Sequence, residues 1–115
     1  MINRAAVMLR YKAPAVAWIN EADPGGGREL TLADVNRERT VYLIREEDAD
    51  TASQLAAWIK TNYESFFESE LEAWYTATHL WPKDRSFKRF QEWFDVECHT
   101  VLIDTVGGPL SDDES

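Results

Sequence analysis

The sequence of 115 residues has a single cysteine, Cys98, and only two histidines. An intramolecular disulfide and a zinc site built on several cysteines are therefore excluded. No run of apolar residues approaches the roughly 18 that a membrane-spanning helix needs. The first residues also lack the apolar segment and the small-residue cleavage site of a secretory signal. We therefore expect a cytoplasmic protein.

Basic residues are scarce as well: 12 lysines and arginines stand against 21 acidic residues, which gives a formal net charge of −9. Phosphate backbones and anionic lipids repel such a chain, so no direct binding to nucleic acid or to a membrane is expected. The apolar fraction of 44% is that of an ordinary globular protein. We predict one globular domain over residues 1–107, followed by an acidic, mobile tail over 108–115.

Three segments have the composition of strands, namely residues 6–12, 40–44 and 96–106. The nearly continuous apolar run at 40–44 predicts a central strand that is covered on both faces. Helices are predicted to begin at Pro14, at Thr51, and at Asp84 or Ser86, with a single helical turn from Thr31. The order β-α-β-α-α-β predicts an α+β or α/β fold in which helices pack on a sheet of three or more strands.

The longest predicted helix follows Thr51-x-x-Gln54, a capping box. Its apolar residues share one face as far as Phe66, whereas Phe67 and Leu71 have rotated off the centre of that face. The helix is therefore expected to bend, to break or to meet a second contact surface near residues 67–69. Residues 74–81 are predicted to form mostly an ordered loop. The next helix is expected to turn four aromatic residues inward: Phe87, Phe90, Trp93 and Phe94.

Four stretches of the sequence form a recognisable pattern. They are Tyr11-Lys12-x-Pro14-x-x-x-Trp18-Ile19-Asn20, Thr40-Val41-Tyr42-Leu43-Ile44, Gln91-x-Trp93-Phe94-Asp95-Val96-Glu97 and Ile103-Asp104. Together they resemble a family of small, acidic, uncharacterised bacterial proteins, over nearly the whole chain. The resemblance implies a bacterial cytoplasmic protein and brings with it no activity, substrate or catalytic residue.

Glu97 and His99 are the candidates for chemistry, because alternate residues of a strand share one face. The carboxylate can orient the imidazole or share a metal with it, and His79 would be a third ligand. A histidine that is simply hydrogen-bonded or solvated at the end of a strand is the alternative.

Cys98 points to the opposite face from His99, which favours a small buried thiol over a nucleophile. No cofactor is expected, and the run Gly25-Gly26-Gly27 lacks the lysine of a phosphate-binding loop and predicts a loop tip.

Negative charge is concentrated in residues 46–75, which carry one basic and eight acidic residues, whereas residues 1–45 have a net charge of +2. Aromatic residues beside these carboxylates predict a surface for a basic partner protein. On a helix, Glu70 projects away from the side that Glu68 and Glu72 share. The predicted partner-binding residues are Glu68, Glu70, Glu72, Trp74, Tyr75, His79 and Trp81.

The favoured hypothesis is a non-enzymatic interaction or regulatory module that binds a basic partner. Two alternatives stay open: a small metal-dependent or acid–base enzyme centred on Glu97 and His99, and a mimic of nucleic acid. The basic cluster over residues 83–89 is a solvated face or a contact with a second copy of the chain. Burial of the indoles in the core would remove the basis for a docking surface.

Overall fold

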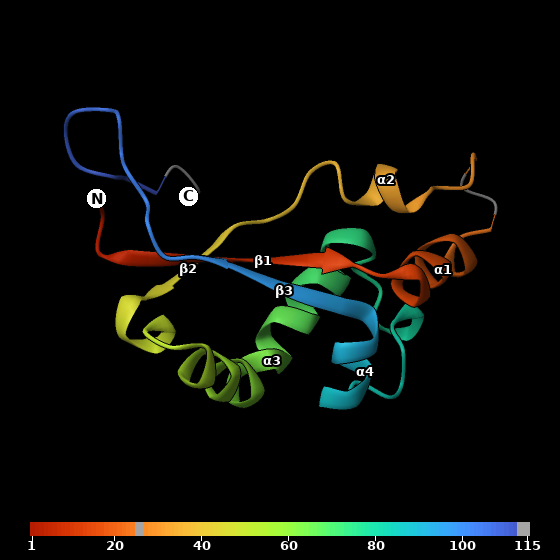
Figure 1. Ribbon diagram of the computed structural model, residues 1–115. Coiled ribbons are helices and arrows are strands. Elements are labelled where there is room, and N and C mark those ends of the chain that lie inside the picture. Colours follow the sequence, from red (N-terminus) through yellow and green to blue (C-terminus); the bar gives the residue numbers. More distant parts are fainter. Residues whose placement is uncertain (25–26, 113–115) are drawn as a thin grey trace.

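The computed structural model describes residues 1–24 and 27–112 of the chain. Helices pack on a three-stranded antiparallel sheet in the strand order β2-β1-β3 (Figure 1), so the predicted α+β fold is confirmed. The elements are, in order, β1 (Arg4–Tyr11), α1 (Ala13–Ala22), α2 (Leu32–Val35), β2 (Tyr42–Arg45), the 3-10 helix η1 (Glu46–Ala49), α3 (Ala52–Trp74), the 3-10 helix η2 (Thr78–Leu80), α4 (Phe87–Trp93) and β3 (Phe94–His99).

The central strand is β1, because it pairs with β2 on one side and with β3 on the other. The prediction that residues 40–44 form a central strand is therefore wrong. β2 lies at an edge of the sheet, and Val41 and Leu43 remain about half exposed, at 52% and 51%. Leu43 pairs with Ala6 on the sheet face opposite α3 and α4, and its exposure shows that this apolar strand is not covered on both faces.

Helices α3 and α4 cover the other face of the sheet (Figure 1), and the hydrophobic core lies between them and the strands. Alternate residues of β1 point into this core: Ala5, Val7, Leu9 and Tyr11 are all at most 5% exposed. Val7 pairs with Tyr42 and Leu9 pairs with Val96, so neighbouring strands add their own inward residues at the same level. The register thereby fixes which side chains face the helices.

Helix α3 begins as predicted, with the Thr51 hydroxyl accepting a hydrogen bond from the backbone N–H of Gln54. The helix then runs without interruption to Trp74. Phe66 packs on Tyr42 of β2, with ring centroids 4.7 Å apart, whereas its neighbour Phe67 packs on Phe90 of α4 at 5.8 Å. The predicted second contact surface near residues 67–69 is therefore observed, and the predicted break is not.

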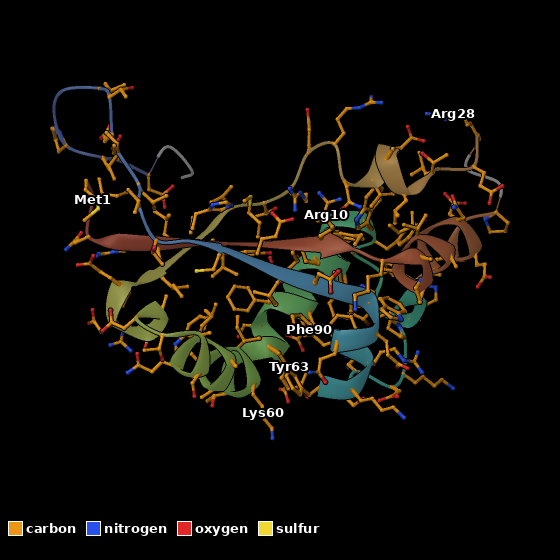
Figure 2. The ribbon with its side chains drawn as sticks, viewed as in Figure 1. Met1, Arg10, Arg28, Lys60, Tyr63 and Phe90 are labelled. Carbon is orange, nitrogen blue, oxygen red and sulfur yellow. The ribbon has the colours of Figure 1, made fainter. Side chains whose placement is uncertain are left out.

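Helix α4 is capped by Ser86, whose hydroxyl accepts from the backbone N–H of Arg89. Phe90 and Trp93 are buried, as predicted, and Phe94 is buried as the first residue of β3. Tyr63 of α3 faces Phe90, while Lys60 points away from the core (Figure 2). The predicted loop at residues 74–81 starts after α3 and contains the single turn η2.

The last strand is shorter than predicted, since β3 ends at His99 and not near residue 106. A hydrogen bond from the Ile2 N–H to the Leu102 carbonyl still ties the following segment to the N-terminus. Val101 and Ile103 are nevertheless 68% and 70% exposed. The segment has a high strand propensity, but among the described residues it pairs with no strand. Residues 113–115 of the predicted tail lie outside the described residues. Within the described part, no helix is long and apolar enough to cross a membrane.

Candidate functional site

The C-terminal ends of helices α1 and α3 meet at one end of the molecule. The Tyr75 hydroxyl, just after α3, donates a hydrogen bond of 2.5 Å to the Ile19 carbonyl in the last turn of α1. The C-terminus of a helix carries a partial negative charge, which basic side chains commonly offset. Neither helix has a basic residue in its last turn. Two helix C-termini without a basic residue in their last turns therefore lie side by side.

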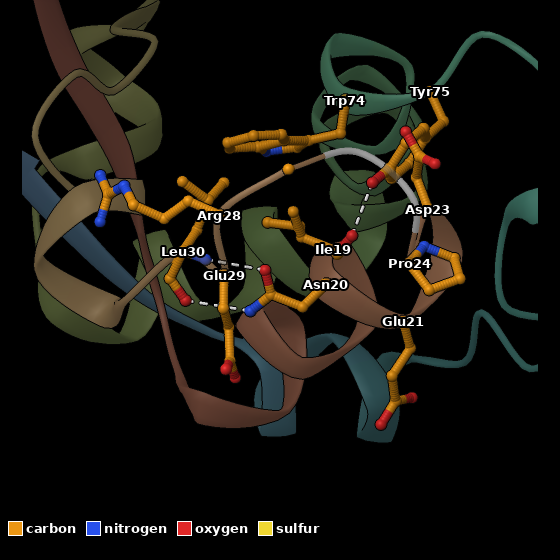
Figure 3. Close-up of a pocket in the computed structure, with 11 residues that line it drawn as sticks. Ile19, Asn20, Glu21, Asp23, Pro24, Arg28, Glu29, Leu30, Trp74 and Tyr75 are labelled. Atoms are coloured by element: carbon orange, nitrogen blue, oxygen red, sulfur yellow. Dashed lines mark hydrogen bonds between the residues drawn. The ribbon is translucent and has the colours of Figure 1, made fainter.

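One pocket, here called the Asn20 pocket, lies between the end of α1 and the segment that follows it (Figure 3). Its volume is about 440 Å³. In Figure 3 the Trp74 ring lies at one side of the pocket, with Arg28, Asn20 and Leu30 near it. Three acidic residues line the Asn20 pocket: Glu21, Asp23 and Glu29.

A second pocket, here called the Glu70 pocket, lies on the α2 side of Trp74 and has a volume of about 480 Å³. Trp74 lines both pockets and so connects them. The Glu70 pocket is lined by the residues Tyr11, Asp34, Val35, Arg37, Glu38, Thr40, Glu70, Ala73 and Trp74.

The two pockets collect negative charge from distant parts of the chain. All five acidic residues among residues 1–45 line them, and Glu70 is the sixth carboxylate. Arg28 and Arg37 are the two basic lining residues, and both face Asp34, with N–O distances of 3.2 and 3.6 Å. We call the six carboxylates and the indole together the Trp74 surface, which comprises Glu21, Asp23, Glu29, Asp34, Glu38, Glu70 and Trp74.

Glu70 is the buried member of this surface, with 6% of its area exposed. The Tyr11 hydroxyl donates to its Oε1 at 2.8 Å, and the Tyr42 hydroxyl donates to its Oε2. The Trp74 indole N–H in turn donates to the Tyr11 hydroxyl at 3.0 Å. Burial, followed by the adjacent charge of Glu70, raises the pKa of Tyr11. Both phenols therefore stay protonated and hold the carboxylate in a fixed orientation.

Two asparagine side chains hold the segment between α1 and β2 in place. The Asn20 amide accepts from the Leu30 N–H and donates to the Leu30 carbonyl, both at 2.9 Å. The Asn36 amide does the same with the backbone of Tyr11, at 2.8 and 3.1 Å. These paired hydrogen bonds anchor the chain just before and just after α2, next to the acidic residues Glu29, Asp34 and Glu38.

Asp34 forms a capping box with Thr31 at the start of α2, the single helical turn that the sequence predicts there. Its carboxylate accepts from the Thr31 backbone N–H at 2.9 Å and from Arg28 at 3.2 Å. These hydrogen bonds, that from the Thr31 backbone first, lower the pKa of Asp34 from 3.8 to about 2. Asp34 therefore stays ionised, its charge is offset by Arg28 and Arg37, and the other carboxylates supply the free negative charge of the surface.

Replacing Arg28 with alanine is expected to raise the pKa of Asp34, because one hydrogen bond and one positive charge are lost. The value should stay below 3.8, since the Thr31 backbone N–H still donates to the carboxylate. A pH titration of the Asp34 carboxyl carbon by NMR measures the change. An unaltered pKa would show that the Arg28–Asp34 ion pair does not form in solution.

Of the residues predicted to bind a partner, one group lies at or beside the two pockets, and the other is exposed on α3 and η2. Glu70, Trp74 and Tyr75 line the two pockets, and Trp81 donates its indole N–H to the Tyr75 carbonyl at 2.7 Å. Glu68 and Glu72 lie on the exposed side of α3, opposite the buried Glu70. His79 is exposed on η2. Trp74, Tyr75 and Trp81 are each partly buried, and their polar atoms are hydrogen-bonded within the protein.

Glu97 and His99 lie on β3, on the sheet face opposite α3 and α4. Two arginines bind the Glu97 carboxylate: Arg39 at 3.0 Å and Arg10 at 3.1 Å. These contacts, that of Arg39 first, lower the pKa of Glu97, so it is held as an ion-paired carboxylate. His99 is exposed at the strand end. Among residues 1–24 and 27–112, no three histidines, cysteines or carboxylates lie close enough together to hold a metal ion.

Sequence reasoning missed the acidic residues at positions 21–38, although they form most of the Trp74 surface. These residues belong to a segment with a net positive charge, so counting charge along the chain conceals them. In space the segment separates its charges, since Arg10 and Arg39 bind Glu97 and Lys12 binds Asp95, both on β3. The one available signal was the absence of a basic residue at the end of either helix.

Comparison of the chain with protein-family models, with curated protein sequences and with solved structures finds no match.

Proposed function

We propose that this protein is a non-enzymatic binding module that uses the Trp74 surface to hold a basic segment of a partner protein. The observation that carries this proposal is the meeting of two helix C-termini with six carboxylates that line the two pockets beside one indole. Positive charge is attracted to helix C-termini and to carboxylates alike. The ring of Trp74 adds a favourable contact for a cation or for an aliphatic stem.

The distribution of free charge on this surface supports the same conclusion. Arg28 and Arg37 face Asp34, so they do not offset Glu21, Asp23 or Glu29. Within the described residues these three carboxylates are exposed and form no ion pair. Their charge is therefore available to a partner that carries lysine or arginine.

A titration with a short peptide of alternating arginine, lysine and glycine tests the proposal. The variant Glu21→Gln, Asp23→Asn, Glu29→Gln removes three charges at the Asn20 pocket. Exposed ion pairs contribute a few tenths to about 1 kcal/mol each, so the Kd measured by calorimetry is expected to rise about tenfold. Binding of the unmodified protein should also weaken as salt is added.

The matched control is Glu64→Gln, Glu68→Gln, Glu72→Gln, which removes three charges from the exposed side of α3. Both variants have the same net charge, so overall attraction cannot account for a difference between them. The control is expected to bind within about twofold of the unmodified protein. A larger loss in the control than in the first variant would place the binding surface on α3, and no peptide binding at low salt would refute the proposed function.

A further inference from the structure

Glu70 is a buried carboxylate without a counter-ion. No lysine, arginine or histidine of the described residues lies within ion-pair distance of it, although 94% of its area is covered. A buried charge is costly to maintain unless it is paired and hydrogen-bonded. The two phenols supply hydrogen bonds but no positive charge. The structure therefore contains half of a buried ion pair.

The geometry points to the other half: we infer that the Glu70 pocket receives the guanidinium group of one arginine side chain of the basic partner. This inference rests on the proposed function and assigns the position at which a single residue is recognised. Glu70 and Trp74 both line the pocket, so a side chain that enters it meets a carboxylate and an indole together. Its volume of about 480 Å³ is ample for one long side chain.

The shape of the Glu70 network favours guanidinium over ammonium. Each carboxylate oxygen accepts one phenol hydrogen bond and retains capacity for another, so two oxygens in a fixed plane remain for a donor. Guanidinium is planar and presents two parallel N–H groups to such a pair. It is also more weakly hydrated than ammonium and stacks on indole rings, which suits a partly covered site beside Trp74.

The orientation of Trp74 is fixed before any ligand binds. Its indole N–H is engaged by the Tyr11 hydroxyl, and that hydroxyl is engaged by Glu70. The ring and the carboxylate are therefore coupled through one phenol and need no rearrangement on binding. A preorganised site of this kind loses little conformational entropy when a ligand enters.

Three small probes test the inference with the full-length protein by NMR: the acetylated amides of arginine, lysine and citrulline. Citrulline has the shape of arginine without the charge. Only the arginine probe is expected to shift the Trp74 indole N–H resonance saturably. Equal shifts with citrulline would overturn the role of charge, and equal shifts with lysine would overturn the assignment to guanidinium.

The variant Glu70→Gln keeps the side-chain shape and removes the charge. It is expected to weaken arginine-probe binding at least tenfold, whereas the control Glu68→Gln should leave it unchanged. If Glu70→Gln does not fold, the three probes on the unmodified protein still decide the question. If the basic peptide binds the Trp74 surface but the arginine probe produces no saturable shift, the inference fails and the proposed function survives. If neither the basic peptide nor the arginine probe binds, both the proposed function and the inference are refuted.

Discussion

Replacing Phe67 with alanine is expected to lower the free energy of unfolding by about 3–5 kcal/mol. Phe67 is fully buried, and its ring lies 5.6 Å from those of Trp93 and Phe94 and 5.8 Å from that of Phe90. The substitution would leave a cavity where α3, α4 and β3 meet, and neighbouring aromatic rings are too rigid to fill it. For a domain stabilised by some 5–15 kcal/mol, this loss is a large share of the total.

Urea unfolding of the two proteins measures the effect. The control is Phe87→Ala, which removes the same atoms at a partly buried site that stacks on Phe90 at 6.2 Å. It should cost less than half as much, because much of the space it leaves is open to water. A loss below about 1 kcal/mol for Phe67→Ala would contradict the packing of α3 against α4 described above.

The second large effect is a steep loss of stability in alkali. The pKa of Tyr11 is raised, first by burial and then by the charge of Glu70, and the pKa of Tyr42 is raised by burial and by its hydrogen bond to Glu70. In the unfolded chain a tyrosine titrates near pH 10. Below that pH the phenols are protonated in both states, and their contribution to stability is fully present.

Above about pH 10 the unfolded chain releases these protons while the folded protein keeps them, so unfolding becomes easier as the pH rises. Each such tyrosine lowers the free energy of unfolding by up to about 1.4 kcal/mol per pH unit, until its folded pKa is reached. Urea unfolding of the unmodified protein and of Tyr11→Phe at several pH values above 9 measures the slopes. Tyr11→Phe is expected to reduce the slope of the free energy of unfolding against pH by the contribution of one proton, up to about 1.4 kcal/mol per pH unit. This holds whatever the effect of the substitution on absolute stability. Equal slopes would mean that Tyr11 is not buried against Glu70.

The local parts of the fold were predictable because the residues that decide them are neighbours in sequence. Thr51 and Ser86 begin their helices through hydrogen bonds that span three residues, and the capping box of Thr31 and Asp34 works in the same way. The strand order was not predictable. Whether residues 40–44 lie at the centre or the edge depends on which strand takes the place beside β1, and no local pattern encodes that choice.

In the candidate site, too, the features set by neighbouring residues were predictable, whereas the contacts between distant parts of the chain were not. Helical spacing alone places Glu70 opposite Glu68 and Glu72, and the burial of Glu70 agrees with this. The partners of Glu70 come from β1 and β2, at separations of 59 and 28 residues. Such distances along the chain conceal the network from any reading of composition or periodicity. The acidic residues at 21–38 were hidden because the basic residues within residues 1–45 outnumber them.

The amide groups of Asn20 and Asn36 have a consequence for how this protein can change. Each makes the pair of hydrogen bonds that a peptide unit would make, Asn20 with the Leu30 backbone and Asn36 with the Tyr11 backbone. The chain between the two asparagine contacts is thus held at both ends by side-chain hydrogen bonds. It does not need the β-branched residues that favour a strand. Substitutions at the exposed positions of this stretch, outside its capping box and the buried Val35, can therefore retune charge and selectivity at little expense to folding, which makes them the natural place for new specificity to arise.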